Sequence, residues 1–384
     1  MVDTKTRRVL LYRLGSLGDM VVALPALHLV ARAFPDAERR LLTNVPVHAK
    51  APAAAAVLEG SGLVSGYLPY PVGTRSVWQL LTLWAALRRW RPQVLVYLAS
   101  ARGVEVARRD ARFFRLCGVK QMVGVPLIEA MQRNFYGADT DAACEGDWEP
   151  EAARLARNIA ELGDARVADP SSWDLRLSAA ERLEAERQIG AAVLDGEDAL
   201  RPIAVSVGTK VQAKDWGVEN WCALLGRMAE AKPGRTLLLI GAAEESAASE
   251  FAATAWRERS GGPVVNLCGS LNPRQSAAAL ERAELFVGHD SGPMHLAAAV
   301  GTPCVAIFAA RNIPRQWFPV GAQHRVLYHR VDCWGCGLET CIEQQKKCLL
   351  SITVDEVMEV VGSQLSVVGK NTTPENRQPT TENP

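Results

Sequence analysis

The sequence has almost no net charge and no long apolar run. Its 384 residues carry 43 Lys and Arg against 42 Asp and Glu, which leaves a formal net charge of +1. A chain without a global positive field is not expected to attract nucleic acid, so a contact with a polyanion requires a local patch. No segment approaches the roughly 18 consecutive apolar residues of a bilayer-spanning helix. These absences argue against a nucleic-acid-binding protein and against an integral membrane protein.

Two further signals are missing near the start of the chain. The first segment is basic, but Arg13 and Asp19 interrupt its apolar run too early for a secretory signal peptide. The glycine-bearing turn that follows lacks the G-x-G-x-x-G fingerprint of dinucleotide-binding domains. We therefore expect a soluble, cytoplasmic protein that is not a typical dinucleotide-binding enzyme.

Short apolar runs alternate with longer helical patterns along most of the chain. With 48% hydrophobic and 22% charged residues, the chain is large enough for two α/β domains, each with its own core. The alternation is typical of parallel sheets covered by helices on both faces. We predict strands at 7–14, 40–43, 63–68, 94–99, 121–125, 203–207, 236–240, 264–267, 285–287 and 304–308. We predict helices at 20–34, 77–90, 104–117, 150–162, 218–231, 244–259, 273–282, 294–300 and 354–368.

A polar passage from Gly163 to Ser172 divides the chain into two such halves. We predict an N-terminal Rossmann-like domain over 1–168 and a C-terminal one over 169–352, followed by a helix at 353–368. Residues 369–384 are rich in Thr, Asn, Pro and Glu with almost no apolar residues, so we expect this tail to be disordered.

The segment from Val287 to His295, V-G-H-D-S-G-P-M-H, carries the most informative chemical signal. It predicts a strand, a tight turn and a helix with Pro293 in its first turn. Small Ser291 and Gly292 leave the first N–H groups of that helix open, which favours binding of a phosphorylated ligand. Asp290 and His295 stand beside this anion site, where they could bond sugar hydroxyls or phosphate oxygens. The alternative is an ordinary capped turn.

A second turn of this kind follows the first predicted strand. In Gly15-Ser16-Leu17-Gly18-Asp19, two glycines let the backbone bend and one carboxylate stands at the mouth of the unit. Ligands of open α/β sheets bind at such positions. The alternative role of Asp19 is helix N-capping.

Three ordered motifs make the chain similar to glycosyltransferase family 9, the ADP-heptose:lipopolysaccharide heptosyltransferases. They are G-S-L-G-D-M-V-V-A-L-P-A-L at 15–27, K-x-W at Lys214–Trp216, and D-S-G-P-M-H-L-A-A-A-V-G-T-P at 290–303. The resemblance extends to about Ile352. It implies the α/β architecture called GT-B, in which two Rossmann-like parallel-sheet domains face an interdomain cleft. It also implies inverting, metal-independent transfer of a sugar from a nucleotide donor, bound mainly by the C-terminal half, to an acceptor held by the N-terminal half.

The resemblance assigns two residues to the reaction. Asp19 matches the family's general base, and an ordinary Asp carboxylate is ionised at pH 7 and ready to accept a proton. Lys214 matches the family lysine on the departing diphosphate. A charge pair at about 4 Å and an effective dielectric near 20 gives about 4 kcal/mol, against about 0.3–2 kcal/mol for a helix terminus, so Lys214 should matter more than the helix dipole. Gly217 stands where the family usually has proline.

The same resemblance assigns donor contacts in both halves of the chain. Glu244 matches the carboxylate on the ribose, although Glu245 is an equally defensible alignment, and Leu271 matches an apolar contact to the adenine. Helix-terminal charge and core packing are the alternative roles of these two residues, and core packing is that of His295. The predicted donor-binding residues are Gly18, Ser206, Gly208, Thr209, Glu244, Leu271, Asp290, Ser291, Gly292 and His295.

The cysteines are unevenly placed. Cys333, Cys336, Cys341 and Cys348 form C-x2-C-x4-C-x6-C, whereas Cys117, Cys144, Cys222, Cys268 and Cys304 are scattered and expected to be buried. In a reducing compartment, four clustered cysteines suggest structural zinc more than disulfides, with reduced structural thiols as the alternative.

No cofactor is expected to be required for catalysis. The sequence Asp139-Thr140-Asp141 has the D-x-D spelling of a metal-dependent transferase, but no apolar strand leads into it. We interpret it as a surface turn and expect no divalent ion in catalysis.

The acceptor side shows a basic pattern. Arg108, Arg112 and Arg115 recur at helical spacing, with Arg102 before them and Arg133 in the following loop. Arginine forks suit the carboxylates and phosphates of an inner-core lipooligosaccharide. We take Arg102, Arg108 and Arg112 as candidate acceptor-binding residues; a solvated helix face is the alternative.

The expected partners are a nucleotide sugar such as ADP-heptose and a lipid-linked glycan. Such an acceptor would bring the enzyme into peripheral contact with the inner face of the cytoplasmic membrane. Trp78, Trp84 and Trp90 on one predicted helix could aid docking, but core packing explains them more simply. Two alternatives remain open: a nucleotide-sugar epimerase of similar fold, and a noncatalytic nucleotide-sugar or metal-binding protein.

Overall fold

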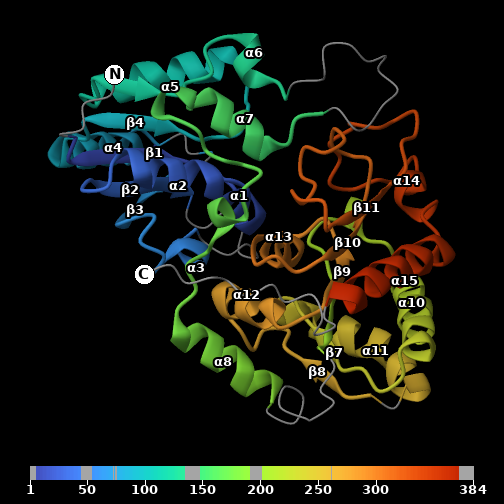
Figure 1. Ribbon diagram of the computed structural model, residues 1–384. Helices are drawn as coiled ribbons and strands as arrows, with labels where there is room; N and C mark the ends of the chain where they lie inside the picture. Colours follow the sequence, from blue (N-terminus) through green and yellow to red (C-terminus); the bar gives the residue numbers. More distant parts are fainter. Residues whose placement is uncertain are drawn as a thin grey trace.

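The chain folds into two α/β domains, each built on a parallel sheet with helices on both faces (Figure 1). The computed structural model describes residues 6–44, 54–71, 73, 76–134, 148–190, 201–260 and 262–371. This confirms the predicted architecture of two parallel-sheet domains. Among the described residues, no helix combines the length and the apolar character needed to cross a membrane.

The N-terminal sheet has five strands in the order β3-β2-β1-β4-β5. Their bounds are β1 Arg8–Tyr12, β2 Glu38–Asn44, β3 Gly66–Tyr70, β4 Val94–Tyr97 and β5 Gln121–Val123. Successive side chains of a strand point to opposite faces, so β1 sends Val9 and Leu11 to one core and Leu10 and Tyr12 to another. The first core contains α1 (Leu17–Val22), α2 (Leu24–Ala33), α3 (Ala55–Leu58) and α7 (Glu151–Asn158), and the second contains α4 (Val77–Trp90) and α5 (Val104–Leu116).

The C-terminal sheet has six strands in the order β11-β10-β9-β6-β7-β8. Their bounds are β6 Ile203–Ser206, β7 Leu237–Leu239, β8 Val264–Asn266, β9 Leu285–His289, β10 Cys304–Phe308 and β11 Arg325–Tyr328. One face packs on α12 (Pro273–Glu281) and α13 (Gly292–Ala299). The other packs on α10 (Val218–Ala231), α11 (Ser246–Ser260) and α15 (Val354–Asn371).

The two domains share one apolar core. Residues of α1, α2 and α3 belong to the same buried cluster as residues of α12 and α13. The start of α1 and the start of α13 touch, since a Cβ added at Gly292 would lie 3.1 Å from Cδ2 of Leu17. The interface therefore brings together the carboxyl ends of β1 and β9, where ligands of α/β sheets bind.

The segment after α7 leads the chain from the first domain to the second. The segment that follows α7 still packs on α2, as η3 (Pro170–Trp173) shows, whereas the next helix, α8 (Ala179–Ile189), packs on α12. The crossing therefore lies between Asp174 and Ser178. The sequence did not predict helix α8.

Buried Arg274 of α12 holds the crossing segment in place. Its guanidinium donates to the carbonyl oxygens of Val57, Leu175 and Arg176 at 2.8–2.9 Å. It also pairs with Glu181 of α8, with 2.5 Å between Nε and Oε1. One side chain thus joins the first domain, the crossing segment and the second domain.

Several predicted bounds differ from the structure. The single helix expected over 20–34 is divided into α1 and α2, because Pro25 lies in the first turn of α2 and cannot continue a preceding helix. Residues 369–371, expected to be disordered, extend α15, and the rest of the predicted disordered tail lies outside the described residues. The short α6 (Glu129–Gln132), α14 (Lys347–Leu350) and strand β11 were not predicted.

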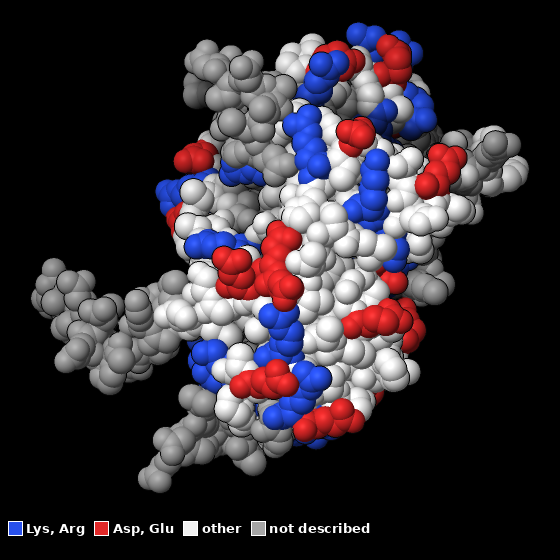
Figure 2. All heavy atoms as spheres, turned by 90° about the vertical axis from the view of Figure 1, so that its right-hand side faces the viewer, with Lys and Arg blue, Asp and Glu red and all other residues white. Residues whose placement is uncertain are grey.

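Basic and acidic side chains are interspersed on the face of the molecule that lies on the right in Figure 1, with neither sign dominating it (Figure 2). This agrees with the net charge of +1. The local exception is described below.

We predict that Arg274→Leu lowers the free energy of unfolding by about 3–5 kcal/mol, because it leaves Glu181 and three carbonyl groups without their buried partner. Urea unfolding followed by circular dichroism measures this change. The control is Glu281→Gln, which removes the exposed pair between Glu281 and Arg182 across the same two helices and should leave the midpoint nearly unchanged. Equal losses in both variants would contradict the role of Arg274.

Candidate active site between the two domains

Asp19 lies at the start of α1, after the carboxyl end of β1. Its Oδ2 accepts hydrogen bonds from the backbone N–H of Ser16 at 2.8 Å and from the Ser16 hydroxyl at 2.9 Å. Its Oδ1 lies 3.3 Å from Nη2 of Arg13. Ser16, not Asp19, is therefore the N-cap of α1, and Asp19 is the third helical residue, whose carboxylate bonds back to the cap. The Asp19 side chain is still 20% exposed.

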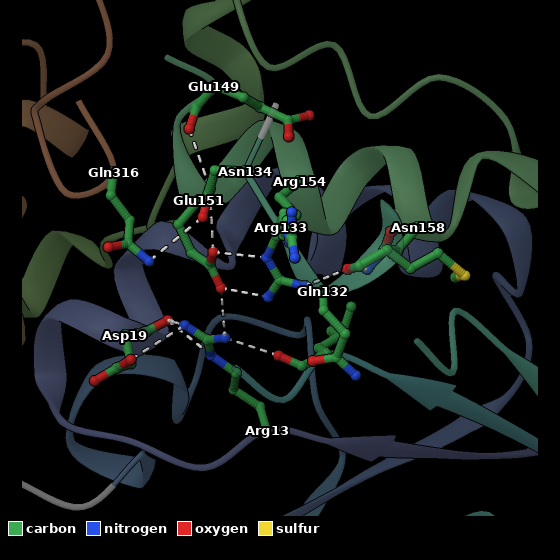
Figure 3. Close-up of polar contacts among 12 residues, drawn as sticks. Arg13, Asp19, Gln132, Arg133, Asn134, Glu149, Glu151, Arg154, Asn158 and Gln316 are labelled. Carbon is green, nitrogen blue, oxygen red and sulfur yellow. Dashed lines mark hydrogen bonds and ion pairs between the residues drawn. The ribbon is translucent and has the colours of Figure 1, made fainter. Parts of the chain in front are cut away.

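A buried charge network holds Arg13 and thereby Asp19 (Figure 3). Nη1 of Arg13 donates to the carbonyl oxygen of Leu98 at 2.8 Å and lies 3.7 Å from Oε1 of Glu151. Arg154 forms a bidentate ion pair with the same carboxylate. Its Nη2 donates to Oε1 at 2.6 Å and its Nε donates to Oε2 at 2.8 Å. Arg13, Glu151 and Arg154 are each at most 2% exposed. Two guanidinium groups and two carboxylates thus balance in charge inside the first domain.

A segment of the second domain closes over this network. The carbonyl oxygen of Gln316 accepts from the backbone N–H of Glu151 at 2.9 Å. The amide of Gln316 donates to Oδ1 of Asn134, which also lies beside Glu151 (Figure 3). The network below Asp19 is therefore in contact with both domains.

The second domain contributes Lys214, Asp290 and His295. Nζ of Lys214 lies 2.7 Å from Oδ2 of Asp290 and donates to the Asp290 carbonyl oxygen at 3.1 Å. Nε2 of His295 lies 3.8 Å from Oδ1 of Asp290. Burial lowers the pKa of His295 below its ordinary value, an effect that the nearby carboxylates of Asp290 and Asp19 partly oppose. His295 is therefore a neutral imidazole at pH 7.

These residues face Asp19 across the domain boundary. A Cβ added at Gly18 would lie 2.7 Å from Cδ2 of His295, so the backbone next to Asp19 rests directly on the imidazole. The Asp19 carboxylate is also close enough to His295 to act on the pKa of the imidazole. The structure brings Gly18, Asp19, Lys214, Asp290, Gly292 and His295 into one place.

The loop ends of β6 and β9 carry two hydroxyls that have no hydrogen-bond partner among the described residues. Oγ of Ser206 and Oγ of Ser291 are both buried from solvent. Buried hydroxyl groups are normally hydrogen-bonded. Two unsatisfied ones at adjacent strand ends, β6 beside β9, mark a place where a polar ligand would fit.

The structure places Glu245, rather than Glu244, against the loop after β6. A Cβ added at Gly208 would lie 2.4 Å from the carboxyl carbon of Glu245, whereas Glu244 is exposed. Oε2 of Glu245 accepts from the backbone N–H of Ala242 at 2.7 Å, and burial raises the pKa of this carboxyl. Thr209 lies in the same loop, and Leu271 packs at the edge of the shared core.

His289 and Trp216 hold the loop that contains the K-x-W motif. Nε2 of fully buried His289 accepts from the backbone N–H of Trp216 at 3.1 Å, and the Trp216 indole donates to the Ile352 carbonyl oxygen at 2.9 Å. Burial lowers the pKa of His289 to about 4, so it stays a neutral acceptor. These bonds fix the loop that carries Lys214. The sequence offered no role for His289, and its position directly before Asp290 was the one available signal.

A separate pocket of about 520 Å³ lies at the carboxyl end of the N-terminal sheet, where β4 and β5 lead into α5 and α6. Arg102 and Arg108 line it together with Leu127 and Ile128. Nη2 of Arg102 is held by Oδ2 of Asp110 at 2.7 Å. Arg112, the third residue expected here, is exposed but does not line the pocket.

The four clustered cysteines are exposed or half-buried, and the Cys341 sulfur accepts a backbone N–H from Lys346 at 3.4 Å. Among the described residues, no group of three or more His, Cys, Asp or Glu side chains is arranged to hold a metal ion. Zinc binding by these thiols stays a prediction from the sequence. Of the other cysteines, Cys222 is half-buried rather than buried, and Cys144 and the segment Asp139-Thr140-Asp141 lie outside the described residues.

The family model of glycosyltransferase family 9 (heptosyltransferase) matches residues 151–347, and the chain belongs to this family. A segment of 50 residues is 44% identical to lipopolysaccharide heptosyltransferase 3 of Escherichia coli, covering 13% of this chain and 15% of that protein's length.

Two solved structures share the fold over most of the chain. The glycosyltransferase family 9 protein of Veillonella parvula has a TM-score of 0.65 at 16% identity and covers 96% of this chain and 99% of its own. The Escherichia coli heptosyltransferase WaaC with ADP-2-deoxy-2-fluoro heptose has a TM-score of 0.59 at 19% identity, covering 93% and 99%. The architecture is therefore GT-B.

We predict that Glu151→Gln lowers the free energy of unfolding by about 3–5 kcal/mol, because it leaves two buried guanidinium groups with one carboxylate fewer. Thermal and urea unfolding measure the change. The same substitution at exposed Glu105, which pairs with Arg108 on the surface of α5, is the control and should have little effect. A wild-type midpoint for Glu151→Gln would rule out charge balance in this network.

Proposed function

We propose that the protein is an inverting, metal-independent glycosyltransferase that moves heptose from ADP-heptose onto a lipopolysaccharide core or a related cell-envelope glycan. One observation carries the proposal: Asp19 of one domain and Lys214, Asp290 and His295 of the other meet where the start of α1 contacts the start of α13. Membership of glycosyltransferase family 9 supports the transfer reaction. The heptosyltransferase relative and the ADP-2-deoxy-2-fluoro heptose in the WaaC structure support the choice of donor.

The donor diphosphate would bind between Lys214 and the start of α13. An ammonium group has three N–H donors. The structure uses Lys214 for two acceptors, both on Asp290, which leaves a donor for phosphate. The first N–H groups of α13 and the unsatisfied hydroxyls of Ser206 and Ser291 add further donors. Glu245 is better placed than Glu244 to meet a ribose bound over Gly208.

Asp19 would act as the general base. In a single displacement, the acceptor hydroxyl gives its proton to the Asp19 carboxylate while its oxygen bonds to the anomeric carbon of the donor. The bond from that carbon to the diphosphate breaks, and Lys214 with the α13 terminus stabilises the charge that the diphosphate gains. Because fixed positive groups already meet this charge, we propose that no divalent ion takes part.

The acceptor would occupy the first domain. Arg102 and Arg108 line the pocket at the carboxyl end of that sheet, where their guanidinium groups suit phosphates or carboxylates of the glycan. The site of action would be the inner face of the cytoplasmic membrane, and the protein would be cytoplasmic. Structural zinc at Cys333, Cys336, Cys341 and Cys348 would take no part in the transfer step, although the backbone N–H of Cys341 donates to Oε1 of Gln212, two residues before Lys214, at 2.9 Å.

We expect Asp19→Asn to reduce kcat by about 10²–10⁴ while leaving the Kd of ADP-heptose unchanged, because the amide keeps the shape but cannot take a proton. Release of ADP in the presence of a delipidated core acceptor measures kcat, and calorimetry measures donor binding. Asp36→Asn, at an exposed turn, is the control. Wild-type turnover in Asp19→Asn would exclude the base, and sugar rearrangement without acceptor would indicate an epimerase.

Lys214→Met should weaken ADP binding about tenfold to a hundredfold, the range expected for a charge-assisted hydrogen bond. Titration of ADP, UDP and GDP followed by thermal shift gives both affinity and base preference. Lys232→Met, on the second domain away from the cleft, is the control. Unchanged ADP affinity in Lys214→Met would exclude a phosphate contact, and a response only to UDP or GDP would exclude the heptosyl donor.

A further inference from the structure

Helix α4 has an apolar outer side that none of the described residues covers. Trp78 is 79% exposed, Val77 65% and Leu81 46%. At 100° per residue, Trp78, Leu81 and Ala85 form the line farthest from the sheet, because the buried side consists of Leu83, Leu87 and Trp90. This corrects the expectation that the tryptophans of this helix serve core packing, which holds for Trp90 alone. A helix that is apolar on both sides is normally buried.

The apolar surface continues onto α5. The indole of Trp84 donates to the carbonyl oxygen of Leu116 at 3.1 Å, and Leu116 is 71% exposed. The two helices thus form one outward patch, which we call the α4–α5 surface. It consists of Val77, Trp78, Leu80, Leu81, Trp84 and Leu116.

Positive charge lies beside this patch. Between Gly60 and Lys120 the sequence has ten arginine and lysine residues but only two acidic residues, in a chain whose overall net charge is +1. Of the two acids, Asp110 is buried against Arg102, and Glu105 pairs with Arg108. The exposed basic side chains beside the patch are Arg88, Arg89, Arg112, Arg115 and Lys120. The mixed face in Figure 2 has no such excess.

We propose that the α4–α5 surface docks on an anionic lipid bilayer, with α4 lying in the plane of the membrane interface. Indole and aliphatic side chains enter the boundary between headgroups and acyl chains, while the flanking arginines meet anionic headgroups. A second copy of this surface is a poorer occupant. A twofold dimer would bring each basic rim against an identical one.

The docked orientation places the acceptor pocket near the membrane. Arg102 and Arg108, which line the pocket, lie just before and within the first turns of α5, and Leu116 is the last residue of that helix. Thirteen residues of α-helix span about 20 Å. A lipid-linked acceptor could therefore reach the pocket from the bilayer without leaving it. This step rests on the proposed function, whereas docking itself does not.

Sedimentation with vesicles tests the proposal on the full-length protein without donor or acceptor. The vesicles contain either phosphatidylcholine alone or phosphatidylcholine mixed with phosphatidylglycerol. We expect binding to the anionic vesicles that falls as salt is raised and little binding to the neutral ones. The combined variant Trp78→Ser and Leu81→Ser should lower the partition coefficient at least about tenfold. Arg88→Gln with Arg89→Gln should lower it on anionic vesicles too.

The matched control is Phe251→Ser, which removes a side chain that is 64% exposed on α11 of the second domain. It should bind like the wild type. Equal losses in the control, equal binding to neutral vesicles, or no vesicle binding at all would overturn the proposal. A dimer in solution that Trp78→Ser dissociates, without vesicle binding, would assign the patch to self-association instead. Inactivity in the transfer assay would leave these results unaffected.

Discussion

The close approach of two helix starts, α1 from the first domain and α13 from the second, is the constraint on which the site depends. The approach is possible because residues 18 and 292 are glycines. At Gly18 even a methyl group would overlap the imidazole of His295. Each motif therefore has a glycine at the contact and an aspartate next to it in the sequence or two residues before it, Asp19 beside Gly18 and Asp290 before Gly292.

Next to this contact, the buried charges of the first domain orient Asp19. Removing one member of a buried ion network is costly, but replacing the whole network with apolar groups of similar size is often neutral or stabilising. The particular contribution of Arg13, Glu151 and Arg154 is therefore the position that they impose. Their effect is to fix a guanidinium beside Oδ1 of Asp19, while Ser16 holds Oδ2. A carboxylate held on both oxygens keeps one position and one direction of approach for a proton donor.

The order of most strands and helices along the chain could be predicted from the sequence, but their tertiary packing could not. Apolar runs located β1, β4, β6 and β10 because these strands are buried on both faces and contain few polar residues. Helix α8 was missed although Ser178 and Glu181 form a capping box, since its charged surface lacks a clear apolar stripe. Strand β11 was missed because it is an edge strand with one buried residue.

Some residues of the candidate site could be predicted from the sequence and others could not. Asp19, Lys214 and the 290–295 segment could be found because each follows a strand within a short motif. The network of Arg13, Glu151 and Arg154 could not, because Arg13 is well over a hundred residues from the other two and meets them only through the packing of the first domain. The sequence also could not predict which α4 tryptophans face solvent, because a helix that is apolar on all sides does not reveal which side packs on the sheet.

The apolar core that continues from one domain into the other has a thermal consequence. Any opening of the cleft wide enough to admit a nucleotide sugar must wet part of that core, and hydration of apolar groups carries a positive heat capacity and weakens their cohesion on cooling. The balance between open and closed forms should thus shift with temperature in a curved rather than linear way. Because that cohesion weakens on cooling, low temperature should favour the open form.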